Sequence, residues 1–492
     1  MTTYDVVLRG GRVIDPETGL DAIADVAIAA GRIAEIGTEL EPAPVDLSVA
    51  GHVVTAGFID LHSHTADIPG LRLRALDGVT TALELEAGVT PVAPAYQRAA
   101  AEGRPINYGF AASWALARME AIAGISLGGG LGTFLANVAS PAWQGAASPG
   151  QLAAIVSRLS ADLADGAIGI GMLVGYAPGC DPDEYLRVAA LAATAGVATF
   201  THARDLIELT PNALIDGAEE IVRAAGETGA QMHYCHINGT SLRHINRVQG
   251  LVARAQAAGS RVSTEAYPYG SGMTGIGAAF LAPERLHERN LTPADLTYAP
   301  TGEQVASEDR LRELRAADPG GLAVIRHLNE DDPADWAVLL RSLTFPDAIV
   351  ASDAMPLTWA GPVPDPMTWP LPDTVFTHPR TAGTFARALR VLGADDGPLG
   401  LAETLRRSSL LPARLLEARV PAMRRKGRVQ AGCDADIVVF DPATVHDQAT
   451  YAQPTRPSTG IRQVLVGGTF VVRDAAIVPE ALPGQPIRAT PR

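Results

Sequence analysis

The amino-acid sequence predicts an α/β fold: a (β/α)8 TIM-like barrel with a small β-sandwich-like domain built from both termini. Through the middle of the chain, apolar β-rich segments alternate with helical stretches, as in βα units on a parallel sheet. Both ends of the chain read instead as short strands bounded by Gly, Pro or Asp. No GxGxxG motif follows the first alternating strand, which disfavours an open dinucleotide-binding sheet.

The two terminal segments, 1–55 and 422–492, predict the small domain. The first contains runs such as Asp5–Arg9, and the second contains runs such as Ala435–Phe440, each with the composition of a short strand. Because both ends are β-rich and the middle is not, we expect them to pair in one small β domain. Two unrelated β appendages are the alternative.

The barrel is predicted over residues 56–421, with an inserted helical segment at about 278–345 that is longer than an ordinary βα connection. The chain has 492 residues. A barrel takes ~250 residues or more, so this length leaves room for the insertion and the small domain. The eight core strands are expected near residues 57–61, 81–85, 107–111, 168–172, 197–201, 231–235, 261–265 and 348–352.

Composition excludes several classes of protein. Hydrophobic residues make up 47% and charged residues 19%, which excludes global disorder. The net charge of −15 argues against a nucleic-acid or anionic-membrane surface. The three cysteines form neither a disulfide framework nor a metal knuckle, and the start lacks the pattern of a signal peptide. We therefore expect a cytoplasmic enzyme with a small-molecule substrate; homo-oligomerisation is left open.

Ionisable residues close the first two predicted strands, where a barrel of this kind carries its reactive groups. Strand 1 runs into His62 and His64, whose i, i+2 spacing puts both on one face of an extended segment. Imidazole is the commonest metal-ligating side chain, although a lone HxH motif is weak evidence. Strand 2 ends in Glu84 and Glu86, and two carboxylates in an apolar run are costly to bury without a cation.

Three further strands end in the same kinds of residue. Strand 5 ends in His202 and Arg204, strand 6 in His233 and His236, and strand 8 in Asp353. We interpret His233 as a hydrogen-bonded core histidine. The remaining strand-end groups predict one metal site, formed by His62, His64, Glu86, His202, His236 and Asp353. One histidine, His327, follows a strand-like run inside the insertion and is left unassigned.

The sequence resembles the amidohydrolase superfamily. The resemblance rests on the segment from Ala56 to His64, the strand-end histidines, the late Asp353 and the segment from Gly432 to Phe440.

Within that superfamily the chain looks like the N-acyl-D-amino-acid deacylases. The matching segments are Asp165–Gly171, Glu265–Tyr269 and His378–Arg387. Two others, Glu84–Gly88 and Ser352–Pro356, are similar to the D-glutamate deacylase subset. The resemblance implies a zinc-dependent hydrolase that removes the acyl group from N-acyl-D-amino acids, above all N-acyl-D-glutamate, with metal-activated water.

The chain departs from its relatives at two places. The metal-ligating cysteine of the D-aminoacylases corresponds to Ala87 by ungapped counting, and the adjacent Glu86 is the natural substitute, reached through a strand-end bulge. Other branches bridge two metals with a carbamylated barrel lysine, but the single lysine here, Lys426, lies in the C-terminal β segment. If two metals bind, a glutamate must bridge them.

The resemblance also implies roles for the site residues. His202, His236 and Glu86 would hold the tighter of one or two Zn²⁺ ions, and His62 and His64 would border a weaker position. Other divalent metals could serve.

Catalysis and substrate binding are assigned in the same way. Asp353 would act as general base and then general acid. Arg380, assisted by Tyr267, would bind the substrate carboxylate. Arg204 would bind a second carboxylate or form an ion pair with Asp205 or Glu208.

Two alternatives stay open. The first is a cyclic amidase of the hydantoinase or dihydroorotase kind, or an isoaspartyl dipeptidase; such relatives usually rely on the barrel lysine that this chain lacks. The second is a non-catalytic amidohydrolase-like structural subunit, which would predict damage to the ligand set.

Overall fold

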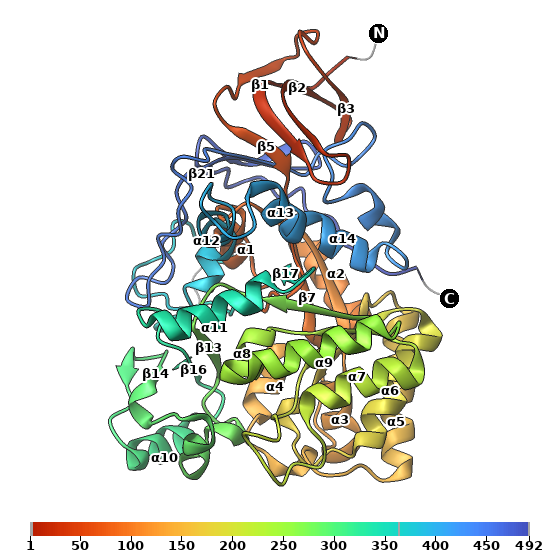
Figure 1. The fold of residues 1–492 in the computed structure, drawn as a ribbon, viewed down its shortest axis with the longest axis vertical. Coiled ribbons are helices and arrows are strands. Elements are labelled where there is room, and N and C mark those ends of the chain that lie inside the picture. Colours follow the sequence, from red (N-terminus) through yellow and green to blue (C-terminus); the bar gives the residue numbers. More distant parts are fainter. Residues whose placement is uncertain (1–2, 363–364, 491–492) are drawn as a thin grey trace.

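The computed structural model describes residues 3–362 and 365–490. Figure 1 shows a small sheet at one end of the molecule and a helix-covered barrel beside it. Within the described residues, no helix combines the length and the apolar character needed to cross a membrane.

Eight parallel strands form the barrel in sequence order, β6 to β12 and then β17. Hydrogen bonds link the ends of the first and last strands, where Ser63 and Ala354 form a parallel bridge. All eight predicted core strands are therefore confirmed. They are β6 (Phe58–Asp60), β7 (Val79–Val89), β8 (Asn107–Ser113), β9 (Gly169–Leu173), β10 (Ala198–His202), β11 (Gln231–Tyr234), β12 (Val262–Ala266) and β17 (Ile349–Val350).

Helices cover the outside of the barrel, and their ends follow from local sequence. In α7, for example, the Asp216 side chain accepts hydrogen bonds from the first-turn amides, and Gly229 ends the helix in the left-handed conformation. The covering helices are α1 (Ile68–Ala75), α2 (Val92–Glu102), α3 (Trp114–Ala123), α4 (Leu131–Asn137), α5 (Pro149–Ala164), α6 (Pro182–Ala195), α7 (Gly217–Thr228), α8 (Ile237–Ser241), α9 (Ile245–Ala257), α11 (Pro333–Thr344), α12 (Arg380–Leu392) and α13 (Leu401–Leu405).

The segment that we expected to be a helical insertion also contains a sheet. Four antiparallel strands pair in the order β13-β16-β14-β15. The strand-like run that precedes His327 is β16. The rest of the prediction is corrected, because the other strands, of two to five residues, are too short to show a periodicity of their own. The insertion comprises β13 (Ser271–Gly275), η4 (Ala279–Leu281), η5 (Pro283–Arg289), η6 (Pro293–Asp295), β14 (Leu296–Tyr298), β15 (Glu303–Gln304), α10 (Glu308–Ala317) and β16 (Leu322–Arg326).

Strands from both termini share one sheet, as predicted. β18 from the C-terminal segment pairs antiparallel with β5 from the N-terminal segment. Apolar side chains from both, such as Leu8 and Val439, pack in a common core. The sheet contains β1 (Val6–Asp15), β2 (Leu20–Ala29), β3 (Arg32–Gly37), β4 (Val45–Ser48), β5 (Val53–Ala56), β18 (Ile437–Phe440), β19 (Ile461–Val466), β20 (Thr469–Arg473) and β21 (Ala476–Ile477).

After the last strand of the small domain, the C-terminal segment packs against the barrel. The amide of Ile487 donates to the carbonyl of Tyr108 at 2.7 Å. Its side chain is 1% exposed and packs with barrel-interior residues and with α14 (Leu411–Leu416). The C-terminal residues thus close one end of the barrel and leave the carboxyl ends of the strands for the site.

Candidate active site

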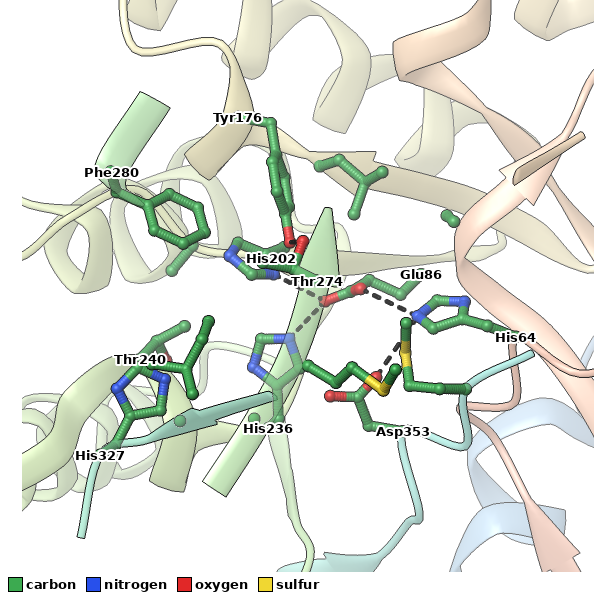
Figure 2. A pocket seen from close by; sticks show the side chains of 18 of the residues that line it. His64, Glu86, Tyr176, His202, His236, Thr240, Thr274, Phe280, His327 and Asp353 are labelled. Atoms are coloured by element: carbon green, nitrogen blue, oxygen red, sulfur yellow. Dashed lines mark hydrogen bonds and ion pairs between the residues drawn. The ribbon is translucent and has the colours of Figure 1, made fainter. Parts of the chain in front are cut away.

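Six side chains meet at the carboxyl ends of the barrel strands. They come from five different strands: two follow β6, and one each comes from β7, β10, β11 and β17. Figure 2 shows His64, His202 and His236 around Glu86, with Asp353 beside His64. The six side chains are those of the predicted metal-site residues, His62, His64, Glu86, His202, His236 and Asp353.

Glu86 lies between two histidine pairs. Its Oε2 is 3.1 Å from His62 Nε2 and 3.6 Å from His64 Nε2. Its Oε1 is 2.7 Å from His236 Nε2 and 3.3 Å from His202 Nδ1. Each pair forms, with Glu86, a set of three ligand atoms that lie within 4.8 Å of one another. The geometry therefore offers two adjacent metal positions that share one carboxylate.

The donor set fits divalent metal ions. Glu86 is 3% exposed, and its Oε1 accepts no hydrogen bond within the described residues although two imidazoles face it. A buried carboxylate oxygen without a partner costs ~1–3 kcal/mol or more, and a cation removes that cost. Attraction to His62 and the neighbouring imidazoles outweighs burial and lowers the pKa of Glu86 well below its usual range. Four imidazoles around a carboxylate are ligands typical of zinc.

The local backbone explains how Glu86 reaches this position. The register between β7 and β8 shifts between Glu84 and Val89, which is the strand-end irregularity that we predicted. β9, the next strand but one in the barrel, passes so close that a Cβ at Gly171 would lie 2.3 Å from the Glu86 carbonyl. A glycine is therefore required at that point of β9.

Carboxylates behind the ligands hold two of the rings. Glu84 lies 2.9 Å from His64 Nδ1, so it supports the ring of a metal ligand. Of the two glutamates at the end of strand 2, Glu86 is therefore the one at the centre of the site. Glu265, at the end of β12, lies 2.5 Å from His62 Nδ1. Such partners fix the tautomer and orientation of a metal-binding imidazole. Glu265 also accepts from His233, which confirms His233 as a hydrogen-bonded core histidine.

Sequence reasoning missed the role of Glu265. Its signal was present, because Glu265 lies at the end of a predicted barrel strand as Glu86 does, but it entered the interpretation only as part of a family motif.

Asp353 faces both the metal positions and a buried arginine. Its Oδ1 lies 3.4 Å from the Nε2 atoms of His62 and His64, and its Oδ2 lies 2.8 Å from Arg380. Burial raises its pKa, but attraction to Arg380 and His62 outweighs burial and holds the pKa well below its usual range. The side chain is therefore a carboxylate, placed to accept a proton beside the metal positions.

The structure gives Arg380 partners other than the one we predicted. Its side chain is fully buried, and its Nε donates to the Asp353 carbonyl at 2.6 Å. It lies 4.6 Å from the centre of the Tyr267 ring. Tyr267 lines the cavity at the metal positions, whereas Arg380 is not among the lining residues.

Arg204 is also engaged within the protein. It lines the cavity, but its guanidinium bonds Glu220 at 2.8 Å and the Cys180 carbonyl at 2.8 Å. Of the two roles that we considered, the structure favours the ion pair, and the partner is Glu220 instead of Asp205 or Glu208.

Two cavity residues from the insertion were not predicted. Arg289, at the end of η5, lies over the Phe280 ring at 4.7 Å, and its Nη1 has no hydrogen-bond partner within the described residues. His327 follows β16, and its Nδ1 also lacks such a partner. Burial, together with Arg289, lowers the pKa of His327 to about 3, so its ring is neutral. The cavity that they line measures about 90 Å³.

The fold and the ligand set together define a metal-dependent hydrolase of the amidohydrolase kind, acting on C–N bonds. No protein-family model matches the chain. A D-aminoacylase of Alcaligenes xylosoxydans xylosoxydans is 30% identical over 498 residues, covering 96% of this chain and 95% of the relative. The chain belongs to the D-aminoacylase family.

Other relatives agree with this assignment. An N-acyl-D-glutamate deacylase of the same organism is 28% identical and covers 98% of this chain and 96% of its own. A D-aminoacylase crystal structure, described as defining a novel subset of amidohydrolases, has a TM-score of 0.76 at 23% identity, covering 99% and 100% of the two chains. A zinc and phosphonate complex of N-acyl-D-glutamate deacylase from Bordetella bronchiseptica has a TM-score of 0.75 at 24% identity, with the same coverage. The dihydroorotase of Geotalea daltonii, in contrast, matches only 17% of this chain.

Proposed function

We propose that this chain hydrolyses N-acyl-D-amino acids with acidic side chains, N-acyl-D-glutamate above all. The observation that carries the proposal is the ligand set around Glu86, with Asp353 beside it. On the same cavity wall lies an arginine nitrogen that has no partner in the part of the chain that the structure describes. The names of the full-length relatives support the D-amino-acid substrate.

Metal binding and proton transfer are assigned to different residues. Two pairs, His62 with His64 and His202 with His236, would hold the metal ions through Glu86. When bound, zinc supplies Lewis acidity and hydroxide at neutral pH. Asp353 accepts a proton from the attacking water and passes it to the leaving nitrogen.

Arg289 is our choice for the side-chain carboxylate of the substrate. Its Nη2 bonds Asp205, whereas its Nη1 has no hydrogen-bond partner within the described residues and can donate a charge-assisted hydrogen bond to a carboxylate. Tyr267 lines the cavity and keeps its predicted role with the α-carboxylate. We assign Arg380, which contacts both Asp353 and Tyr267, to positioning these two residues in place of direct substrate contact.

The test compares Arg289→Met with Arg285→Met. Both arginines lie in η5 and bond Asp205, but only Arg289 lines the cavity. Free-amine release would be measured on N-acetyl-D-glutamate, N-acetyl-L-glutamate and N-acetyl-D-leucine with zinc-loaded protein. A lost charge-assisted hydrogen bond is worth ~1.5–3 kcal/mol, so Arg289→Met should raise KM for the D-glutamate substrate roughly 10- to 100-fold. Equal effects of both variants on all substrates would contradict the role of Arg289.

A further inference from the structure

A second cavity lies beside His64. It measures about 500 Å³, within the usual range of small-molecule sites, and lies between α2, the end of β7 and the glycine-rich segment 128–132. Two residues, His64 and Leu131, line both this cavity and the cavity at the metal positions. Because Leu131 lines both spaces, we take its side chain as part of the wall between them.

The direction of a bound substrate follows from the site. Arg289, Phe280 and His327 form the wall to which we assign the amino-acid half. Figure 2 shows Phe280 and His327 on one side of Glu86 and His64 on the other. A trans amide is planar and sends its two substituents in opposite directions. An acyl group whose carbonyl lies at the metal positions therefore points toward His64 and Leu131.

The lining of the second cavity suits an alkyl chain. Ala95, Ala99 and Phe110 are buried residues on its wall, and the small alanine side chains leave the space open. Four charged residues line the cavity. Arg98 and Glu102 are exposed to solvent. Glu84 and Arg104 are buried, and they pair with His64 and Glu102 respectively. The cavity thus combines a buried apolar wall with charged groups that either lie at the solvent or are paired within the protein.

We propose that this second cavity is an acyl-chain subsite for unbranched acyl groups longer than acetyl. The inference rests on the proposed function and extends it from the amino-acid half of the substrate to the acyl half. The methyl of an acetyl group stays at Leu131, whereas a hexanoyl chain passes Leu131 and lies along α2.

The test fills the cavity from Gly132. This residue is the second of α4, and Gly150 is the second of α5, in another part of the barrel wall. An added Cβ would meet no atom within 4 Å at either position, and neither glycine has a positive φ, so Gly150→Phe is a matched control for Gly132→Phe. Hydrolysis of N-acetyl-, N-butanoyl- and N-hexanoyl-D-glutamate would be compared, after thermal denaturation has verified that the variants are folded.

Burial of a methylene is worth roughly a fourfold gain. The wild type should therefore keep or increase kcat/KM from acetyl to hexanoyl. Gly132→Phe should lower the hexanoyl-to-acetyl ratio at least tenfold, and Leu131→Ala, which widens the passage, should raise it. A chain-length profile shared by wild type, Gly132→Phe and Gly150→Phe would overturn the subsite while leaving the proposed function intact. Failure of the wild type to hydrolyse the acetyl substrate would overturn both.

Discussion

Replacement of Glu86 by glutamine keeps the shape of the central side chain and removes its charge. Both carboxylate oxygens lie within 3.6 Å of imidazole nitrogens from two histidine pairs. Opposite unit charges 4 Å apart attract by about 4 kcal/mol at an effective dielectric constant of 20. Loss of the carboxylate beside a divalent ion should therefore weaken metal binding by at least ~1000-fold.

The assay for this prediction combines metal analysis with activity. Glu86→Gln should bind one zinc ion or none per chain after dialysis, and kcat/KM on N-acetyl-D-glutamate should fall at least ~100-fold. Glu84→Gln is the matched control, because it removes an equal charge two residues away, from a carboxylate that bonds the Nδ1 of His64. Its effect should stay within ~10- to 100-fold. Two zinc ions bound to Glu86→Gln with wild-type affinity would refute the bridging role.

Three further predictions concern catalysis and stability. Asp353→Asn should keep its zinc and lose ~100- to 10,000-fold in kcat, measured by free-amine release, because the proton acceptor is gone; retention of more than a few per cent would contradict that role. Burial raises the pKa of Asp77 to about 7. The stabilisation that protonated Asp77 provides is therefore full below about pH 4 and is lost as pH rises to about 7. The free energy of unfolding measured in urea should depend less on pH in Asp77→Asn than in the wild type. Ile487→Ala should cost ~2–5 kcal/mol in the same assay, because this side chain packs inside one end of the barrel; a change below ~0.5 kcal/mol would show that the C-terminal residues are dispensable there.

The barrel strands and the metal-site residues could be predicted because their signals are local. A parallel strand that is buried on both faces appears in the sequence as an apolar run. The residue that closes the run lies at the carboxyl end of the strand, where the site forms, whatever the conformation of the loops. His62, Glu86 and Asp353 were found in this way, and the structure brings them together.

The cavity wall supplied by the insertion could not be predicted in the same way. Arg289 reaches the cavity from the short helix η5, and His327 follows β16, whose pairing in a small antiparallel sheet has no signal in the sequence. Arg380 was placed correctly near the site, but its partner was not predicted, because an ion pair with Asp353 depends on how α12 packs and not on any spacing in the sequence.

The most direct test of the central claim is amide hydrolysis with matched enantiomers. Free-amine release from N-acetyl-D-glutamate and N-acetyl-L-glutamate would be followed with protein stripped of metal and with the same protein reloaded with zinc. The account predicts release from the D enantiomer only, absent without metal and restored by zinc. Zinc-loaded protein that cleaves neither enantiomer, or stripped protein that keeps full activity, would contradict it.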